Sequence, residues 1–184
     1  MANFAIIDTE TNWLDEVMSI GAIVAHADTF EPVDSYYYII TPEHKVGGMF
    51  SCALFFEDES LNLQCSRGEA LADLIACFER YGIEDIFAYN ASFDYRHLPE
   101  LSSFAWYDIM RIAAYRQHNT KIPKTYDCYG TGRLKRGYGV EPILRLLIGD
   151  ETYCEQHNAL TDAFDELKIM KLLQHELNKY VKMY

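Results

Sequence analysis

The chain has 184 residues, of which 49% are hydrophobic and 24% are charged, and we expect residues 1–184 to form one globular domain with a sizeable core. No apolar run approaches the length that spans a bilayer, and the first residues lack the basic region of a secretory signal, so we expect neither a membrane protein nor a secreted one. The five cysteines include no Cys-x-x-Cys pair, which predicts reduced thiols in a cytoplasmic protein, and the net charge of −12 argues against a nucleic-acid-binding surface over the protein as a whole.

The first part of the chain predicts three strands joined by short connections. Residues 4–10 and 17–26 are apolar runs, and residues 33–40, bounded by prolines, are rich in Tyr and Ile. Gly21, inside the second run, marks either a bulge or a close approach of another backbone. Short connections favour an antiparallel meander, and residues 43–63 that follow are predicted to be mostly loop.

The second part alternates helical and strand patterns. The clearest helix covers residues 66–81, where Ser66 and Glu69 form a capping-box pair and Gly82 ends the pattern. Further helices are expected at 91–101, 107–116, 140–148 and 159–180, and short strands at 84–89 and 104–106. Three antiparallel strands followed by helix–strand units predict an α/β fold with a mixed five-stranded sheet flanked by helices.

Residues 117–139 show no regular pattern and carry much of the positive charge. Residues 111–145 hold eight lysines and arginines against two acids, which gives +6 locally and leaves −18 for the remainder. A basic stretch on an acidic body can attract a polyanion, although an ordinary solvated loop is the alternative. The cations that we single out for contacts to a nucleic-acid backbone are Lys121, Lys124, Arg133, Lys135 and Arg136.

Two carboxylates lie one residue apart at the end of the first strand. Because positions two apart on a strand share a face, Asp8 and Glu10 point the same way. Two like charges on one face of a core strand are costly unless a cation compensates them, which indicates a divalent metal site. A solvated turn after the strand is the alternative.

Two further stretches place polar residues at the ends of elements. Asp94 falls at the start of a helix, and His157 and Asp162 fall at the start of the last one. Taken alone, Asp94 could be an acid favoured by the helix dipole, and His157 a cap or surface residue. Positions five apart lie roughly 140° apart around a helix, so we expect His157 in the preceding loop or the first turn, on a segment able to move.

Four carboxylates can hold two Mg²⁺ or Mn²⁺ ions about 3.5–4 Å apart, the arrangement used for phosphodiester cleavage. The four are Asp8, Glu10, Asp94 and Asp162. One ion would activate a water molecule and the other would stabilise the leaving oxygen. His157 would accept the proton of that water, because the ordinary pKa of histidine lies near neutrality.

In order and spacing, the three stretches resemble the motifs of the DEDDh 3′–5′ exonucleases, the ribonuclease H-like group that includes polymerase proofreading subunits, oligoribonuclease and ribonuclease T. Residues 7–11 (Ile-Asp-Thr-Glu-Thr) resemble the first motif, 89–94 (Tyr-Asn-Ala-Ser-Phe-Asp) the second, and 157–162 the third, His-x-x-x-x-Asp. The sibling DEDDy group has tyrosine four positions before the last Asp, where this chain has Asn158, so the histidine branch fits better.

The resemblance implies a ribonuclease H-like fold and a metal-dependent exonuclease that shortens single-stranded or 3′-overhanging RNA or DNA from the 3′ end and releases nucleoside 5′-monophosphates. It implies that Asp8, Glu10 and Asp162 ligate metal directly, that Asp94 does so directly or through water, and that His157 is the general base. Several members of that family are dimers, so a homodimer is the assembly to test.

The resemblance also implies contacts to the terminal nucleotide. Backbone groups of residues 9–11 would meet the 3′-hydroxyl, and Trp13 or Leu14 would pack on the last base. The candidate contacts are Thr9, Thr11, Trp13, Leu14, Asn90 and Phe93, of which the last is equally suited to core packing. Where the family often has Thr-Thr-Gly after the Glu, this chain has Thr-Asn-Trp, so the pocket for the terminal base differs.

Two other functions stay open from the sequence. One is a catalytically idle ribonuclease H-like module that binds nucleic acid or a partner protein, and the other is an endonuclease of the ribonuclease H type. A complete set of four acids and a histidine argues against the idle module, because such a module has no need of costly clustered carboxylates. An endonuclease would cut circular substrates, which an exonuclease leaves intact.

Overall fold

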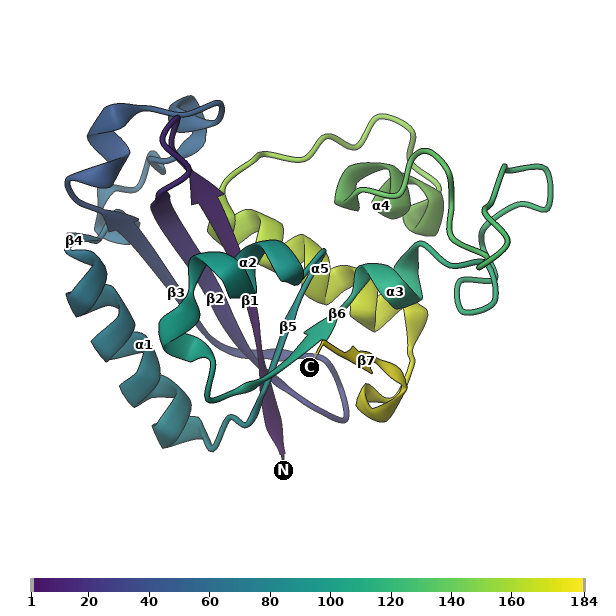
Figure 1. Ribbon diagram of the computed structural model, residues 1–184, viewed down its shortest axis with the longest axis horizontal. Helices are drawn as coiled ribbons and strands as arrows, with labels where there is room; N and C mark the ends of the chain where they lie inside the picture. The colour runs from purple at the N-terminus through teal and green to yellow at the C-terminus, as the bar shows by residue number, and fades with distance from the viewer. Residues whose placement is uncertain (1, 184) are drawn as a thin grey trace.

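The computed structural model describes residues 2–183, and a seven-stranded sheet of order β4-β3-β2-β1-β5-β6-β7 forms its centre (Figure 1). The strands are β1 (Asn3–Thr11), β2 (Val17–His26), β3 (Pro32–Ile40), β4 (Gln64–Cys65), β5 (Asp85–Ala88), β6 (Ala105–Asp108) and β7 (Val181–Lys182). The α-helices are α1 (Arg67–Tyr81), α2 (Ser92–His97), α3 (Met110–Ala113), α4 (Val140–Ile148) and α5 (Ala159–Leu173).

The predicted mixed sheet is confirmed, with two additional edge strands. β1, β2 and β3 form an antiparallel meander, and β5 and β6 run parallel to β1. The expected count of five strands was wrong because β4 pairs with β3 and β7 pairs with β6 over two residues each. Pairs this short carry no hydrophobic period that a sequence pattern could reveal.

Three predicted helices end elsewhere than expected. α5 stops at Leu173 instead of residue 180, because Gln174 takes a left-handed conformation with φ 53°. α2 stops at His97, two residues before Pro99, which begins a 3-10 turn. The expected helix at 107–116 is only α3, because β6 continues to Asp108 through its pairing with β5.

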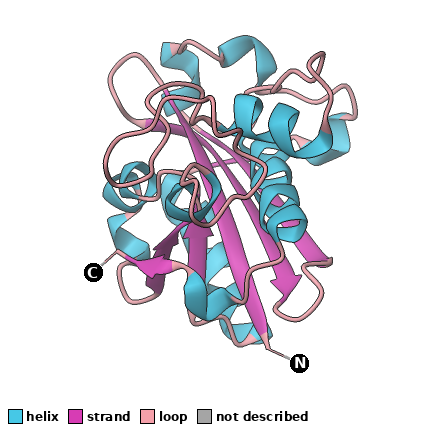
Figure 2. Cartoon of the chain, turned by 90° about the vertical axis from the view of Figure 1, so that its right-hand side faces the viewer, coloured by secondary structure: helices cyan, strands magenta, loops and turns pink. Residues whose placement is uncertain are grey.

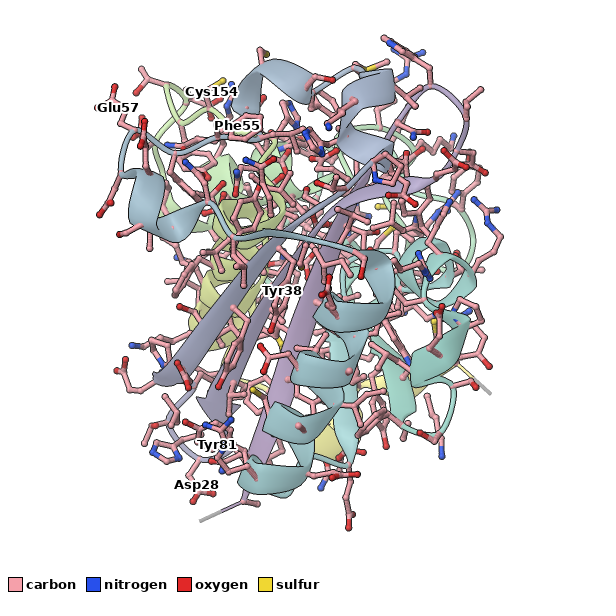
Figure 3. The ribbon with its side chains drawn as sticks, turned by 90° about the vertical axis from the view of Figure 1, so that its left-hand side faces the viewer. Asp28, Tyr38, Phe55, Glu57, Tyr81 and Cys154 are labelled. Carbon is pink, nitrogen blue, oxygen red and sulfur yellow. The ribbon has the colours of Figure 1, made fainter. Side chains whose placement is uncertain are left out.

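Helices cover both faces of the sheet (Figure 2). On one face α1 packs on the sheet, and Tyr38 of β3 donates a hydrogen bond to Asp73 of α1 at 2.8 Å (Figure 3). On the other face α3, α4 and α5 enclose the second core. Along β1, Phe4 and Ile6 belong to this second core, so Asp8 and Glu10, which continue the same alternation, project toward α5.

Gly21 lets the start of α5 rest directly on the backbone of β2. It lies opposite Asp8 in the β1–β2 register, and a Cβ atom there would lie 2.1 Å from the carbonyl oxygen of Ala159. Of the two roles considered for this glycine, the structure shows the close approach. The contact brings the first turn of α5 to the C-terminal end of β1.

Among the described residues, no helix has the length and apolar character needed to cross a membrane.

Candidate active site

A cleft of about 500 Å³ lies at the C-terminal end of β1, which is the upper end in Figure 1. The residues with predicted catalytic roles all line it: Asp8, Glu10, Asp94, His157 and Asp162. Five of the predicted substrate contacts line it as well: Thr9, Thr11, Trp13, Asn90 and Phe93. Leu14 lies beside Trp13 on the adjoining turn, and the five predicted backbone-binding cations lie on residues 117–139. The structure therefore brings three distant segments of the sequence together.

The end of β1 supplies two acids to one side and a threonine to the other. Asp8 and Glu10 face α5, whereas Thr9 faces α2 and is buried. The Thr9 hydroxyl donates a hydrogen bond to Oδ1 of Asp94 at 2.8 Å. The threonine of the first motif thus holds the acid of the second in place.

The junction between β5 and α2 positions Asp94. Asn90 adopts a left-handed backbone with φ 61°, and its N–H donates to Oδ1 of Asp108 at 3.1 Å. This turn starts α2 directly after the strand, so that Asp94 lies in the first helical turn and is buried. Asp108, at the end of the neighbouring β6, anchors the turn.

The start of α5 positions the other two residues. Asn158 is the N-cap, and its Oδ1 accepts a hydrogen bond from the N–H of Leu160 at 3.1 Å. His157 therefore lies in the loop before the helix, with φ 55°, as the spacing predicted. The Asn158 side chain also donates to the Tyr37 hydroxyl at 3.0 Å, which ties the cap to β3.

The donor set fits a divalent cation. Ligand atoms of Glu10, His157 and Asp162 all lie within 4.8 Å of one another. Asp162 is only 5% exposed, and its Oδ1 atom is buried without a hydrogen-bond partner. Among the described residues, no lysine or arginine forms an ion pair with any of the four acids. A buried carboxylate cluster without a positive partner calls for a metal ion.

Burial raises the pKa values of the four acids that the sequence motifs supply. Burial, followed by the neighbouring charge of Asp162, raises the pKa of Glu10 to about 8. Burial and the charge of Glu155 raise the pKa of Asp162 to about 8. Burial raises the pKa of Asp94 to about 7 in spite of the Thr9 hydrogen bond. The pKa of Asp8 also lies well above its usual range, for the same reason and because Asp94 is close.

These shifts predict how the metal-free protein responds to pH. The folded protein holds protons on Glu10 and Asp162 up to pH about 8, whereas the unfolded chain releases them near pH 4. The folded state binds more protons across this window, so its stability falls as pH rises from about 5 to 8. We expect the melting temperature in chelator to drop over that range and the drop to be smaller for Glu10→Gln. A melting temperature in chelator that rises toward pH 8 would contradict the raised pKa values of Glu10 and Asp162.

Sequence reasoning missed two further acids of this region. Glu166 lies one turn after Asp162 on α5, is 1% exposed, and has an Oε2 atom without a hydrogen-bond partner. Burial and the charge of Asp94 hold its pKa well above the usual range. The spacing of four from Asp162 was the available signal, because it places both side chains on one helix face. Glu155, which lines the cleft from the loop before α5, gave no such signal.

Sequence reasoning also missed Phe50. Its ring stacks on the His157 imidazole with the ring centroids 3.9 Å apart and the planes inclined by 19°. Phe50 belongs to the loop after β3, more than 100 positions away in the sequence, and lines the same cleft. The stack fixes one face of the histidine ring and leaves its edge for chemistry.

We expect Phe50→Ala to lower turnover by up to about tenfold, because an aromatic pair contributes about 0.5–1.5 kcal/mol to holding the ring. The same substitution in a His157→Ala background should have no further effect on turnover. Phe55→Ala is the matched control, since Phe55 lies on the same loop and packs on His44 instead. Equal losses in both backgrounds, measured as initial rates, would show that Phe50 does not act through His157.

Asn12 shapes the turn where this chain departs from the family pattern. Its Oδ1 accepts hydrogen bonds from the N–H groups of Leu14 at 2.8 Å and Glu16 at 3.1 Å. The turn presents Trp13 and Leu14 to solvent, each 66% exposed. Trp13 lines the cleft with much of its side chain exposed, and Leu14 lies next to it on the same turn.

Comparisons with known proteins agree on the fold. The nuclease domain of 3′hExo, a DEDDh family member bound to rAMP, superposes with a TM-score of 0.65 at 15% identity and covers 99% of this chain and 96% of that one. A 3′-exonuclease in a structure of histone mRNA stem-loop recognition gives a TM-score of 0.64 at 14% identity, over 99% of this chain and 70% of that one. The chain has the fold of a DEDDh 3′-exonuclease.

More distant similarity extends to a larger enzyme of the same fold. The zinc-bound E. coli exonuclease I in complex with single-stranded DNA gives a TM-score of 0.57 at 14% identity. That alignment covers 97% of this chain and 42% of exonuclease I, so this chain spans about two fifths of its length. No family model matches the sequence, and the search of curated proteins found no match. The DEDDh fold is thus evident in three dimensions at identities of 14–15%.

Proposed function

We propose that this chain is a metal-dependent 3′–5′ exonuclease that acts on single-stranded or 3′-overhanging RNA or DNA and releases nucleoside 5′-monophosphates. The observation that carries the proposal is the meeting of five residues from three segments in one cleft: Asp8, Glu10, Asp94, His157 and Asp162. The DEDDh fold and the nucleic-acid ligands of its structural neighbours, namely rAMP, an mRNA stem-loop and single-stranded DNA, support it.

In the proposed mechanism each acid has a defined part. Asp8, Glu10 and Asp162 would hold the metal ions, and Asp94, oriented by the Thr9 hydroxyl, would hold one directly or through water. Two Mg²⁺ or Mn²⁺ ions would supply Lewis-acid activation of water and stabilisation of the leaving 3′-oxygen. The acids must be deprotonated for this, and their raised pKa values mean that binding the ions releases protons.

His157 is the proposed general base. A ring nitrogen accepts the proton of the attacking water while Phe50 covers the face of the ring. His157 precedes the N-cap of α5, so it can adjust to the substrate without disturbing Asp162 in the helix.

The terminal nucleotide would lie between the acids and the rim of the cleft. Trp13 and Leu14 offer apolar surface for the last base, and the backbone of residues 9–11 offers hydrogen bonds to the 3′-hydroxyl. Phe93 and Asn90 also line the cleft. The five free cysteines support the proposal of a reducing, cytoplasmic environment.

The experiment compares linear and circular single strands of one sequence in the presence of Mn²⁺, with the linear strand labelled at its 5′ end. The proposal predicts a ladder that shortens from the 3′ end, nucleoside monophosphate as product, and an intact circle. Cleavage of the circle would favour the endonuclease, and absence of cleavage with retained binding would favour the idle module.

A further inference from the structure

Residues 117–139, hereafter the basic segment, have a charge opposite to that of the rest of the chain. The basic segment holds five cations and one acid, Asp127, for a net charge of +4. The rest of the chain carries −16, which gives the total of −12. Among the described residues, none of the five cations forms an ion pair. They are Lys121, Lys124, Arg133, Lys135 and Arg136. The positive charge is therefore available to an external polyanion.

The basic segment has a defined conformation although it forms no long strand or helix. Residues 127–135 fold into a hairpin, in which the Tyr129 N–H donates to the Arg133 carbonyl at 2.8 Å and the Lys135 N–H donates to the Asp127 carbonyl at 3.0 Å. Leu134, which belongs to the hairpin, is buried in the core of the protein. This buried leucine anchors the hairpin to the body of the protein.

Three tyrosines of the basic segment expose 41–48% of their surface: Tyr126, Tyr129 and Tyr138. The Arg133 guanidinium lies over the Tyr129 ring at 5.0 Å and over the Tyr138 ring at 5.3 Å. This arrangement orders two aromatic rings around one cation and leaves much of each ring open to solvent. Proteins that bind single-stranded nucleic acid without sequence preference combine such cations with aromatic rings on which bases stack.

The aromatic group adjoins the candidate active site. Tyr89 lines the catalytic cleft, and its hydroxyl donates a hydrogen bond to the carbonyl oxygen of Tyr138. A second cavity of about 730 Å³ lies between the basic segment and α4 and is lined by Tyr126, Lys135 and Arg136, together with Arg145 of α4. The basic segment lies on the side of the molecule that faces the viewer in Figure 2. Tyr138 of the basic segment is therefore in direct contact with a residue of the cleft wall.

We propose that the basic segment is a binding track for single-stranded nucleic acid, in which Tyr129 and Tyr138 stack unpaired bases and the neighbouring cations contact the phosphates. This proposal rests on the exonuclease function and adds a requirement on substrate length, namely unpaired strands long enough to extend beyond the cleft. Duplexes fit less well, because their bases are already stacked on each other. The rest of the chain has a net negative charge, so the long-range electrostatic field favours the approach of a polyanion at the basic segment.

The test measures binding of a 5′-fluorescein 20-nucleotide single strand, as RNA and as DNA, by anisotropy in chelator, where no cleavage occurs. Replacing both Tyr129 and Tyr138 by Ala is expected to weaken binding by 10-fold or more, whereas replacing both by Phe keeps the rings and should retain affinity within about threefold. A duplex of equal length should compete poorly. Initial rates on a dinucleotide with Mn²⁺ should be the same for all three proteins, since a dinucleotide does not leave the cleft.

Unchanged affinity of the Ala variant, equal competition by the duplex, or an equal loss on the dinucleotide would each overturn the track. Melting temperatures of the Ala and Phe variants identify any loss that comes from misfolding. The two proposals fail separately in this design. A wild-type protein that binds the single strand through the tyrosines but cleaves nothing would refute the exonuclease, and one that cleaves the dinucleotide while the Ala variant binds normally would refute the track.

Discussion

Asp162→Asn is expected to lower the turnover of a nucleic-acid strand by about 1,000-fold. Loss of a metal ligand removes several kcal/mol of charge stabilisation in the transition state, and about 4 kcal/mol corresponds to that factor. Asparagine keeps the size of the side chain but removes the negative charge. Because Oδ1 of Asp162 lies buried among other acids without a hydrogen-bond partner, we expect no loss of stability in chelator. Activity and stability should therefore respond differently to this one substitution.

The measurement pairs initial rates in Mn²⁺ with melting curves in chelator and in Mn²⁺. The wild-type protein should gain stability from the metal, and Asp162→Asn should gain much less. Asp165→Asn is the matched control, because Asp165 lies on the same helix and accepts a hydrogen bond from the Tyr153 hydroxyl. A variant at Asp162 that keeps more than a tenth of the wild-type rate would contradict the ligand assignment.

Gly21→Ala is expected to destabilise the protein by about 3 kcal/mol, at the upper end of the usual cost of overpacking. The added Cβ would lie 2.1 Å from the Ala159 carbonyl oxygen and 2.4 Å from the Leu160 nitrogen. Both atoms belong to backbone, so the start of α5 has to move away from β2. For a chain of this size the melting temperature should fall by roughly 6–12 °C. Turnover should fall as well, because the displaced turn carries Asp162.

Gly68→Ala provides the control for this substitution. Gly68 lies in α1, and a Cβ atom there would have no neighbour within 4 Å. Alanine suits a helix better than glycine, so this variant should be as stable as the wild type or more stable. Thermal unfolding of both variants measures the difference. A melting temperature of Gly21→Ala within about 2 °C of the wild type would show that the contact between β2 and α5 is not tight.

The features of this protein that could be predicted are those that depend on short stretches of sequence. β1 is recognisable from its apolar run, and Asp8 and Glu10 from the alternation at its end. The position of His157 before α5 followed from its spacing to Asp162. Such features depend on local geometry, which the order of residues determines directly.

The features that sequence reasoning missed depend on contacts between distant segments. Phe50 reaches His157 only because the loop after β3 folds back over the cleft. Glu166 becomes part of the acidic cluster only because Gly21 allows α5 to lie against β2. The two-residue strands β4 and β7 exist only as pairs with a neighbour. None of these contacts leaves a local period in the sequence.

The most direct test of the nuclease assignment is the digestion of matched 5′-labelled single-stranded RNA and DNA by the wild-type protein and by Asp8→Ala, each with Mn²⁺, with Mg²⁺ and with chelator. The proposal predicts a ladder shortening from the 3′ end that requires a divalent metal and is lost in Asp8→Ala. Cleavage that persists in chelator or in the Asp8→Ala protein, or an uncut strand with either metal, would contradict it.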